Sequence, residues 1–201
     1  MHDWSYTVKI VTWTIASLLV TLIPSFEQGL AAAAPAHSRG AHFPGVKASN
    51  LEKRDFNLPA DFEGDRNLLL VAFEREQQKD VDTWLREMKR FEEIDPGFHY
   101  YELPTIQRPN AFMRWFIDTG MRHGIPDRKA RERTITLYLE KQPFLDSLLI
   151  ADQKKIYAFL VDREGNVLWR SEGVFDETNG AGLRGALGKI ANEWPLCSVS
   201  N

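Results

Sequence analysis

Cysteine is nearly absent from this sequence: among 201 residues there is one, Cys197. A single cysteine excludes an intramolecular disulfide, a Cys-x-x-Cys redox pair and any metal site built from several thiolates. Because Cys197 lies close to the end of the chain, where termini are usually loosely held, we expect it to have no structural role. The alternative is an intermolecular disulfide in an oxidising compartment.

An excess of positive charge is also absent. The chain has 25 Lys and Arg against 28 Asp and Glu, a formal charge of -3. Since binding to nucleic acid depends on a basic surface, no nucleic-acid partner is predicted. Histidine is scarce, and the two in the predicted domain, His99 and His123, belong to separate elements. No metal site and no cofactor are therefore predicted.

A long hydrophobic run is missing as well. The longest uncharged apolar stretch, residues 10–23, has 14 residues, fewer than the roughly 20 that a membrane-spanning helix needs. Lys9 precedes the stretch and four alanines, residues 31–34, follow it, which is the pattern of a secretory signal peptide. We interpret residues 1–36 as a signal peptide cleaved after Ala33 or Ala36, with an uncleaved N-terminal anchor as the alternative. Either reading predicts an exported protein, periplasmic or membrane-associated.

Of all 201 residues, 43% are hydrophobic, and the part after residue 36 fits one globular domain. Residues 37–66 are rich in Pro, Gly and charge and are predicted as a loop-rich lead-in, in which 56–58 could form a short strand. Residues 67–194 form the predicted domain, and 195–201 form a tail.

Within the domain, continuous apolar runs predict buried strands, and apolar residues at a period near 3.6 predict helices. The predicted strands are residues 67–73, 98–103, 134–139, 156–161 and 167–171. The predicted helices are residues 78–94, 109 to about 120 or 124, 144–150 and 182–194. This order predicts an α/β fold with parallel strands, helices on both faces of a mixed sheet, and a C-terminal β-hairpin followed by a helix. Gly165 is predicted to supply a positive φ in the hairpin turn.

The helix after Pro109 has Phe112 and Phe116 at helical spacing, which predicts that both lie in the core. Trp115 lies one step off this stripe and is expected to be exposed. A mostly basic segment, residues 122–133, follows and is predicted as a loop. Its cations would be solvated, or would contact anionic lipid headgroups or an acidic partner. They are Arg122, Arg128, Lys129, Arg131 and Arg133.

Several segments resemble the thioredoxin-like superfamily. They are Phe43-Pro44, Phe56-Asn57-Leu58-Pro59, the run Asn67–Phe73, Trp84, the hairpin Ile156–Trp169 with its turn Asp162-Arg163-Glu164-Gly165-Asn166, and Gly173. Over residues 43–192 the chain more narrowly resembles the family of the mitochondrial ATP-synthase assembly factor, which chaperones subunit a, and its bacterial relatives. The resemblance implies a thioredoxin-like fold, a membrane-adjacent location and a binding role.

Redox members of the superfamily have a reactive cysteine at the helix start after the strand that matches Asn67–Phe73. Here the segment is Glu74-Arg75-Glu76-Gln77-Gln78. Without a thiolate in that position, disulfide exchange and peroxide reduction are not predicted. The predicted function is a non-redox binding or assembly protein with a protein partner in a membrane complex. The predicted binding residues are Arg75, Glu76, Gln77, Gln78, Ile125 and Pro126.

Two alternatives stay open. One is a thioredoxin-fold oxidoreductase or peroxiredoxin-like enzyme that uses Cys197 or an unrecognised cofactor. The other is a membrane-tethered structural subunit, which requires residues 1–36 to remain attached.

Overall fold

The computed structural model describes residues 40–193. Its strands are β1 (Val46–Asn50), β2 (Asp55–Leu58), β3 (Arg66–Ala72), β4 (Phe98–Gln107), β5 (Ile135–Leu139), β6 (Tyr157–Val161) and β7 (Val167–Glu172). Its helices are the short 3-10 helix η1 (Arg75–Gln77), α1 (Gln78–Leu85), α2 (Met88–Ile94), α3 (Ala111–Gly124), α4 (Arg128–Arg133), α5 (Lys141–Ser147) and α6 (Glu177–Glu193). The predicted signal peptide or anchor (1–36) and the tail with Cys197 lie outside the described residues.

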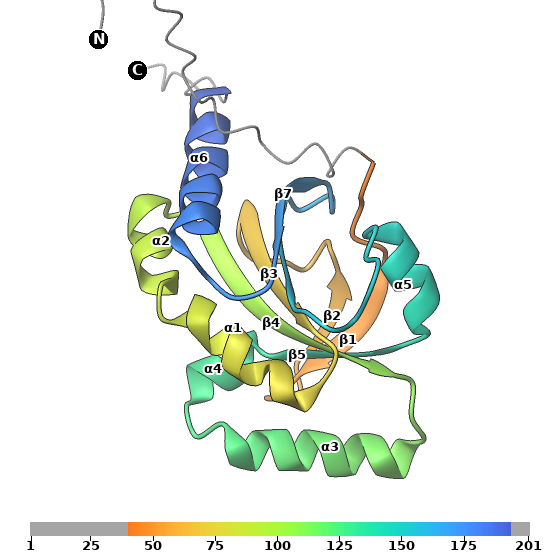
Figure 1. The fold of residues 1–201 in the computed structure, drawn as a ribbon. Helices are drawn as coiled ribbons and strands as arrows, with labels where there is room; N and C mark the ends of the chain where they lie inside the picture. The colour runs from red at the N-terminus through yellow and green to blue at the C-terminus, as the bar shows by residue number, and fades with distance from the viewer. Residues whose placement is uncertain (1–39, 194–201) are drawn as a thin grey trace, which may run out of the picture. The chain divides into compact units, whose positions relative to one another are not determined.

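All seven strands form one mixed sheet in the order β2-β1-β5-β4-β3-β6-β7 (Figure 1). Strands β3, β4 and β5 are parallel, and β6 and β7 form an antiparallel hairpin followed by α6. The hairpin turn contains Gly165 at φ +89°, as predicted. The predicted α/β, thioredoxin-like fold is therefore confirmed.

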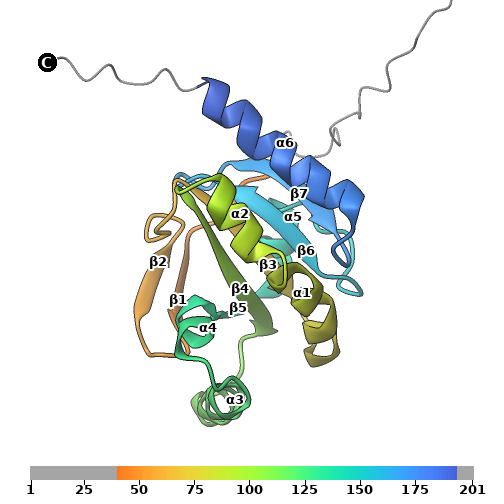
Figure 2. The same cartoon turned by 90° about the vertical axis from the view of Figure 1, so that its left-hand side faces the viewer.

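Strand β3 separates two hydrophobic cores, because successive side chains of a strand point to opposite faces. Leu68 and Leu70 belong to the core beneath α1, α2 and α6, whereas Leu69 and Val71 belong to the core on the α5 side (Figure 2). All four side chains are fully buried. The continuous apolar run of β3 thus reflects burial on both faces.

The first core is centred on Trp84 of α1. Its ring packs edge-on against Trp169 of β7 and Phe175, with ring centres 6.1 and 5.2 Å apart. The indole Nε1–H donates to the carbonyl of Gly173 at 3.0 Å, so the polar atom of this buried ring has a partner. These contacts hold the first helix of the domain to its C-terminal hairpin.

The predicted loop-rich lead-in differs from the structure. Its described part contains β1 and β2, which extend the sheet through pairing of β1 with β5. Phe43 and Phe62 are buried in the second core, where both rings lie against other aromatic rings. The short strand predicted at 56–58 is confirmed as part of β2, whereas β1, which lies between β2 and β5, was missed. A short strand leaves a weak signal in a sequence, and the charges around β1 favoured a loop.

Two other expectations were wrong in detail. The helix predicted over 78–94 is divided into α1 and α2 at Arg86 and Glu87, which the period could not reveal because apolar spacing continues across the break. The basic segment 122–133 is not a loop, since α3 extends to Gly124 and α4 follows. Asp127 begins α4 by accepting from the backbone N–H groups of Lys129 and Ala130. Among the helices of residues 40–193, none has both the length and the apolar character needed to cross a bilayer.

Candidate functional site

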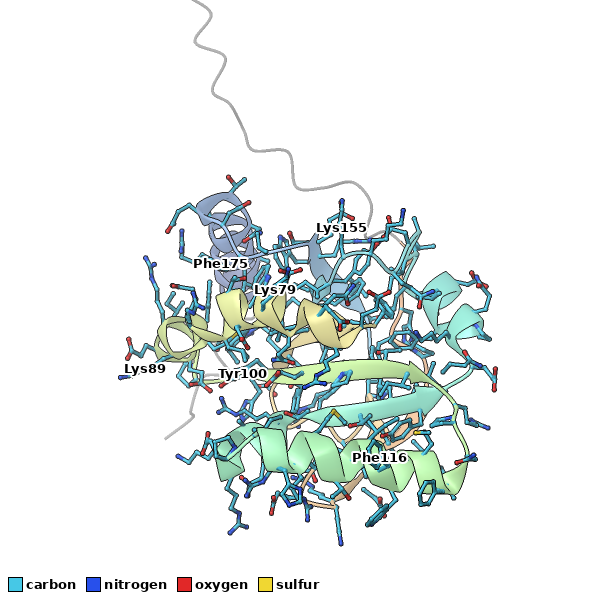
Figure 3. The ribbon with its side chains drawn as sticks, turned by 60° about the horizontal axis from the view of Figure 1, so that its bottom comes forward. Lys79, Lys89, Tyr100, Phe116, Lys155 and Phe175 are labelled. Atoms are coloured by element: carbon cyan, nitrogen blue, oxygen red, sulfur yellow. The ribbon has the colours of Figure 1, made fainter. Side chains whose placement is uncertain are left out.

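The carboxyl end of β3 is the position at which we predicted a binding surface. After Ala72 the chain passes through Phe73 and η1 into α1, the helix on which Figure 3 labels Lys79. We define the β3-end surface as residues 74–78 together with Lys141 and Gln153. It joins segments from three parts of the chain.

Gln77 occupies the centre of this turn and is buried. Its side-chain carbonyl accepts from the backbone N–H groups of Phe73 (2.8 Å) and Glu74 (3.3 Å), and its amide donates to the carbonyl of Gln153 (2.7 Å). The side chain therefore fixes the loop that follows β3 to the loop that precedes β6. An amide is neither a nucleophile nor a proton carrier, so this position supports structure and not catalysis.

Lys141, at the start of α5, lies beside Gln77. Its Nζ donates to Oε1 of Gln153 at 2.9 Å and lies 5.5 Å from the centre of the Phe73 ring. Burial lowers the pKa of Lys141, and the charge of Glu74 opposes that effect. The surface thus presents one partly buried cation next to exposed carboxylates.

Glu102 of β4 is a buried carboxyl next to the surface. It accepts from Nε2 of Gln78 at 3.0 Å. Burial raises the pKa of Glu102, the hydrogen bond from Gln78 opposes this, and the charge of Asp82 adds to it. Gln78 also donates to Asp82 at 3.1 Å, so its side chain is already used in contacts within the domain.

The predicted binding residues belong to two segments of the chain, and their role in binding stays a prediction. Arg75 and Glu76 are exposed at the β3 end, whereas Gln77 is buried and Gln78 is bound to carboxylates. Ile125 and Pro126 lie in the turn between α3 and α4, and their carbonyls accept from Nη1 of Arg131 at 2.9 and 2.8 Å.. In residues 40–193 no hydrogen bond joins this turn to the β3-end surface.

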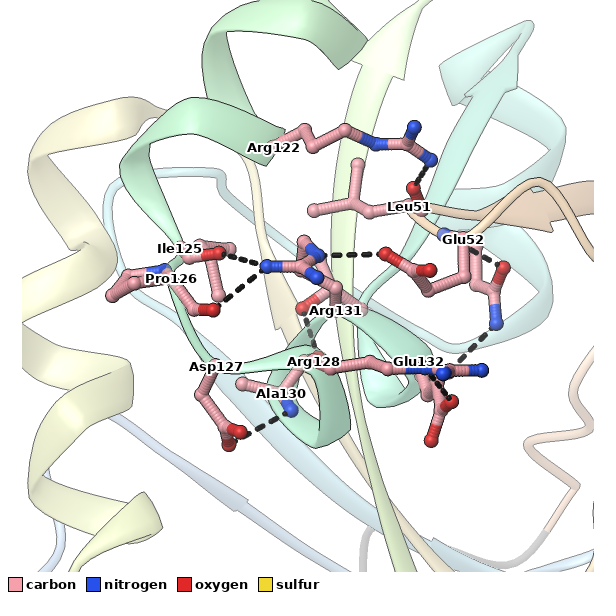
Figure 4. A network of polar contacts seen from close by, with 12 residues as sticks. Leu51, Glu52, Arg122, Ile125, Pro126, Asp127, Arg128, Ala130, Arg131 and Glu132 are labelled. Carbon is pink, nitrogen blue, oxygen red and sulfur yellow. Dashed lines mark hydrogen bonds and ion pairs between the residues drawn. The ribbon is translucent and has the colours of Figure 1, made fainter.

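Most of the predicted basic cluster is engaged within the domain (Figure 4). Arg131 pairs with Glu52 at 2.7 Å, and Arg122 donates to the carbonyl of Leu51. Arg128 pairs with Glu132 at 2.9 Å but remains largely exposed. These contacts fix α3 and α4 to the segment between β1 and β2.

Two members of the cluster differ from the rest. Arg133 pairs with Glu92 of α2 at 2.7 Å and lies over the ring of Tyr100, 4.1 Å from its centre. Lys129 is exposed and has no ion pair within the part of the chain that the structure describes. The cluster therefore contributes mainly to structure, and few of its cations remain available to a partner.

A polar cavity of about 570 Å³ lies between the β1–β2 segment, the start of β4 and α4. Its charged lining residues are largely paired, as in Arg54 with Glu63 and Arg128 with Glu132. His99 is one of its lining residues, and the buried Nδ1 of His99 has no hydrogen-bond partner among residues 40–193. Within residues 40–193, no cluster of three His, Cys, Asp or Glu side chains is arranged to hold a metal ion.

The aromatic side chains of helix α3 are exposed and form a surface separate from the β3-end surface. Phe112 is 70% exposed and Phe116 is 62% exposed, so the prediction that both lie in the core was wrong. Trp115 is 62% exposed, as expected. No residue of α3 is buried. The sequence shows that the helix is amphipathic, but it contains no signal for which face meets the domain.

The comparisons with known proteins identify the fold and no more. No family model and no curated protein matches the chain. An uncharacterised conserved protein from Geobacillus kaustophilus matches with a TM-score of 0.52 at 14% identity, over 81% of this chain and 86% of that chain. A putative electron transport protein from Aquifex aeolicus VF5 also matches with 0.52 at 14% identity, over 74% and 98%. The thioredoxin domain of a thiol-disulfide oxidoreductase from Bacteroides vulgatus matches with 0.47 at 19% identity, over 75% and 96%.

Proposed function

We propose that this protein is an exported, non-redox thioredoxin-fold binding protein that assists the assembly of a membrane complex. The observation that supports a non-redox role is Gln77. At the helix start where redox members of the superfamily have their cysteine, a buried amide makes three hydrogen bonds that fix the turn. A scaffold retained without its chemistry leaves recognition as the simplest remaining function.

The membrane-complex part of the proposal rests on the sequence. The resemblance to the ATP-synthase assembly factor family over residues 43–192 supports a chaperone-like role towards a membrane subunit. The signal-peptide pattern of residues 1–36 supports export. The exposed aromatic side chains of α3 are consistent with a protein that works next to an apolar partner.

An oxidoreductase is the second candidate, because several structures with this fold are named as thiol-disulfide or electron transport proteins. Dithiol exchange needs two thiols, and the chain has only Cys197. An enzyme that used Cys197 alone would lose thiol-dependent turnover in the Cys197→Ser variant. We therefore place this candidate behind the binding role.

The test is affinity capture from native membranes and soluble extract with the tagged full chain, followed by mass-spectrometric identification. The site variant is Arg75→Glu/Glu76→Lys, which reverses two exposed charges of the β3-end surface and preserves the net charge. The matched control is Lys89→Glu/Glu164→Lys, which makes the same exchange at two exposed positions outside that surface.

Capture of subunits of a membrane complex by the wild type and the control, with loss in the site variant, would support the proposed site and role. Equal capture by all three proteins would rule out the β3-end surface as the binding site. Failure of the wild type to retain any membrane subunit above background would contradict the assembly role itself. Intact mass of the exported protein would test cleavage after Ala33 or Ala36.

A further inference from the structure

Helix α3 lies along one end of the domain, beyond the sheet (Figures 1 and 2). It contacts the domain through its polar side. Asp118 accepts from the hydroxyl of Tyr138 at 2.8 Å, and the Arg114 guanidinium lies over the Tyr138 ring, 4.8 Å from its centre. One turn further, Arg122 donates to the carbonyl of Leu51. Residues 114, 118 and 122 are spaced four apart and share one face of the helix.

The apolar side chains of α3 are consequently exposed. Phe112 and Phe116 are also four residues apart and lie on the face opposite Arg114, with Met113 and Trp115 on its two flanks. Their exposed fractions are 70%, 62%, 43% and 62% in the order Phe112, Phe116, Met113, Trp115. The helix is thus amphipathic with its polarity reversed relative to a normal surface helix, which buries its apolar face.

The surroundings of this face are positively charged. Residues 108–133 contain seven basic and three acidic residues, whereas the whole chain has a formal charge of -3. Arg108, Arg114 and Lys129 have no ion pair among the residues that the structure describes. The one acid of α3, Asp118, is bound to Tyr138. An exposed apolar face of Phe, Trp and Met with basic residues beside it is typical of helices that lie in the interface of an anionic bilayer.

We propose that the outward face of α3 docks onto an anionic lipid bilayer, with the rings of Phe112, Trp115 and Phe116 among the headgroups. Arg108 and Lys129, which are exposed, then contact the lipid phosphates. The long arginine and lysine side chains reach the headgroups while the rings enter below them. This surface is separate from the β3-end surface and from the protein partner proposed above.

A second copy of the chain fits this face less well. With side-chain areas on the order of 200 Å² each, the four exposed side chains present roughly 500 Å². A stable interface between two proteins buries about 800 Å² on each partner. Two copies of α3 would also bring two positively charged segments together, whereas an anionic bilayer neutralises them.

The test is hydrogen–deuterium exchange by mass spectrometry on the full chain, followed in the peptide that covers residues 111–121. Exchange is measured without vesicles, with phosphatidylcholine vesicles, and with vesicles of phosphatidylcholine and phosphatidylglycerol in a 7:3 ratio. Because the readout is confined to this peptide, attachment of residues 1–36 to a vesicle does not register in it. The apolar variant is Phe112→Ser/Phe116→Ser, and its control is Ile94→Ser/Val174→Ser, at positions 50% and 47% exposed.

We expect anionic vesicles to slow exchange in this peptide at least about threefold in the wild type and the control. The slowing should be absent in the Phe112→Ser/Phe116→Ser variant and smaller in Arg108→Gln/Lys129→Gln. Unchanged exchange with anionic vesicles would overturn the proposal, as would equal slowing with neutral vesicles. Slowing that needs only a higher protein concentration would instead indicate a second copy. Capture of a membrane subunit is a separate readout, so the two proposals can fail independently.

Discussion

At the scale of single residues, Gln77 and Glu102 show how the domain uses polar groups near the carboxyl end of β3. Gln77 provides hydrogen-bond partners for two backbone N–H groups and one carbonyl, and the N–H of Phe73 among them is buried. Glu102 is a buried carboxyl that accepts a hydrogen bond from the side chain of Gln78 in α1. Gln77 therefore stabilises the turn, whereas the ionised form of Glu102 destabilises the folded domain to an extent that depends on pH.

Replacement of Gln77 by alanine should destabilise the domain by about 2–3 kcal/mol, because it leaves buried backbone groups unpaired. Replacement of the adjacent, exposed Arg75 by alanine should change stability by less than about 0.5 kcal/mol. Urea denaturation of the two variants and the wild type measures both. Equal stability of the two variants would mean that the Gln77 contacts are not needed for the turn.

The substitution Glu102→Gln should stabilise the domain at neutral pH. The pKa of Glu102 is raised by burial, so the folded state favours the protonated carboxyl and its stability falls as the pH rises through that folded-state pKa. A glutamine stays neutral and escapes this loss. The gain should be present at pH 7.5 and should shrink towards zero below the ordinary glutamate pKa of about 4.3. Urea denaturation at pH 7.5 and pH 4 tests this, and a gain that grows on acidification would contradict it.

At the scale of elements, α3 differs from the other helices of seven or more residues in the described chain, because it buries no side chain. Its attachment depends on Tyr138, Arg114 and Arg122 and not on a hydrophobic core. A helix with few buried contacts opens locally at a smaller free-energy cost than the whole domain unfolds. The element that presents the aromatic face is therefore expected to open more easily than the helices that bury side chains in a core.

We expect the amides of α3 to exchange faster than those of α1, which contains the buried Trp84. The substitution Tyr138→Phe removes the hydrogen bond to Asp118 and should accelerate exchange in α3 further. Global stability should fall by no more than about 1.5 kcal/mol, the net contribution of one hydrogen bond. Peptide-resolved exchange and urea denaturation measure the two effects. Exchange in α3 as slow as in α1 would show that the helix is held by more than these polar contacts.

At the scale of the whole molecule, the sheet begins before residue 67, the predicted start of the domain. Strands β1 and β2 close one side of the sheet, and three phenylalanines of this segment are buried in the second core. They are Phe43, Phe56 and Phe62. The second core therefore needs residues that precede β3.

A fragment of residues 40–193 should unfold cooperatively, whereas a fragment of residues 67–193 should not fold. The shorter fragment lacks Phe43, Phe56 and Phe62, and each buried side chain of this size contributes about 1.5–3 kcal/mol. The combined loss is comparable with the total stability of about 5–15 kcal/mol of a typical domain. Near-ultraviolet circular dichroism and thermal unfolding distinguish the outcomes. A cooperative transition in the shorter fragment would show that β1 and β2 are accessory.

The sequence by itself determined the central architecture. Three local signals carried this information: the apolar run of β3, the helical spacing of Val81 and Trp84, and the glycine at position 165. Each is local because burial on two faces, helical spacing and a positive φ affect the choice of residues within a short segment. The absence of a thiol after β3 was equally readable. These features predicted the thioredoxin-like fold and excluded dithiol chemistry.

Only the tertiary structure decided which faces meet. Phe112 and Phe116 have the spacing of core residues, yet both are exposed. They are exposed because the polar side of α3 forms hydrogen bonds with Tyr138 and with the carbonyl of Leu51. The sequence predicted Gln77 to be an exposed binding residue, whereas its side chain is buried and bonded to three backbone groups. Periodicity specifies that a helix has two unlike faces, but the direction in which each one points depends on groups distant in the sequence.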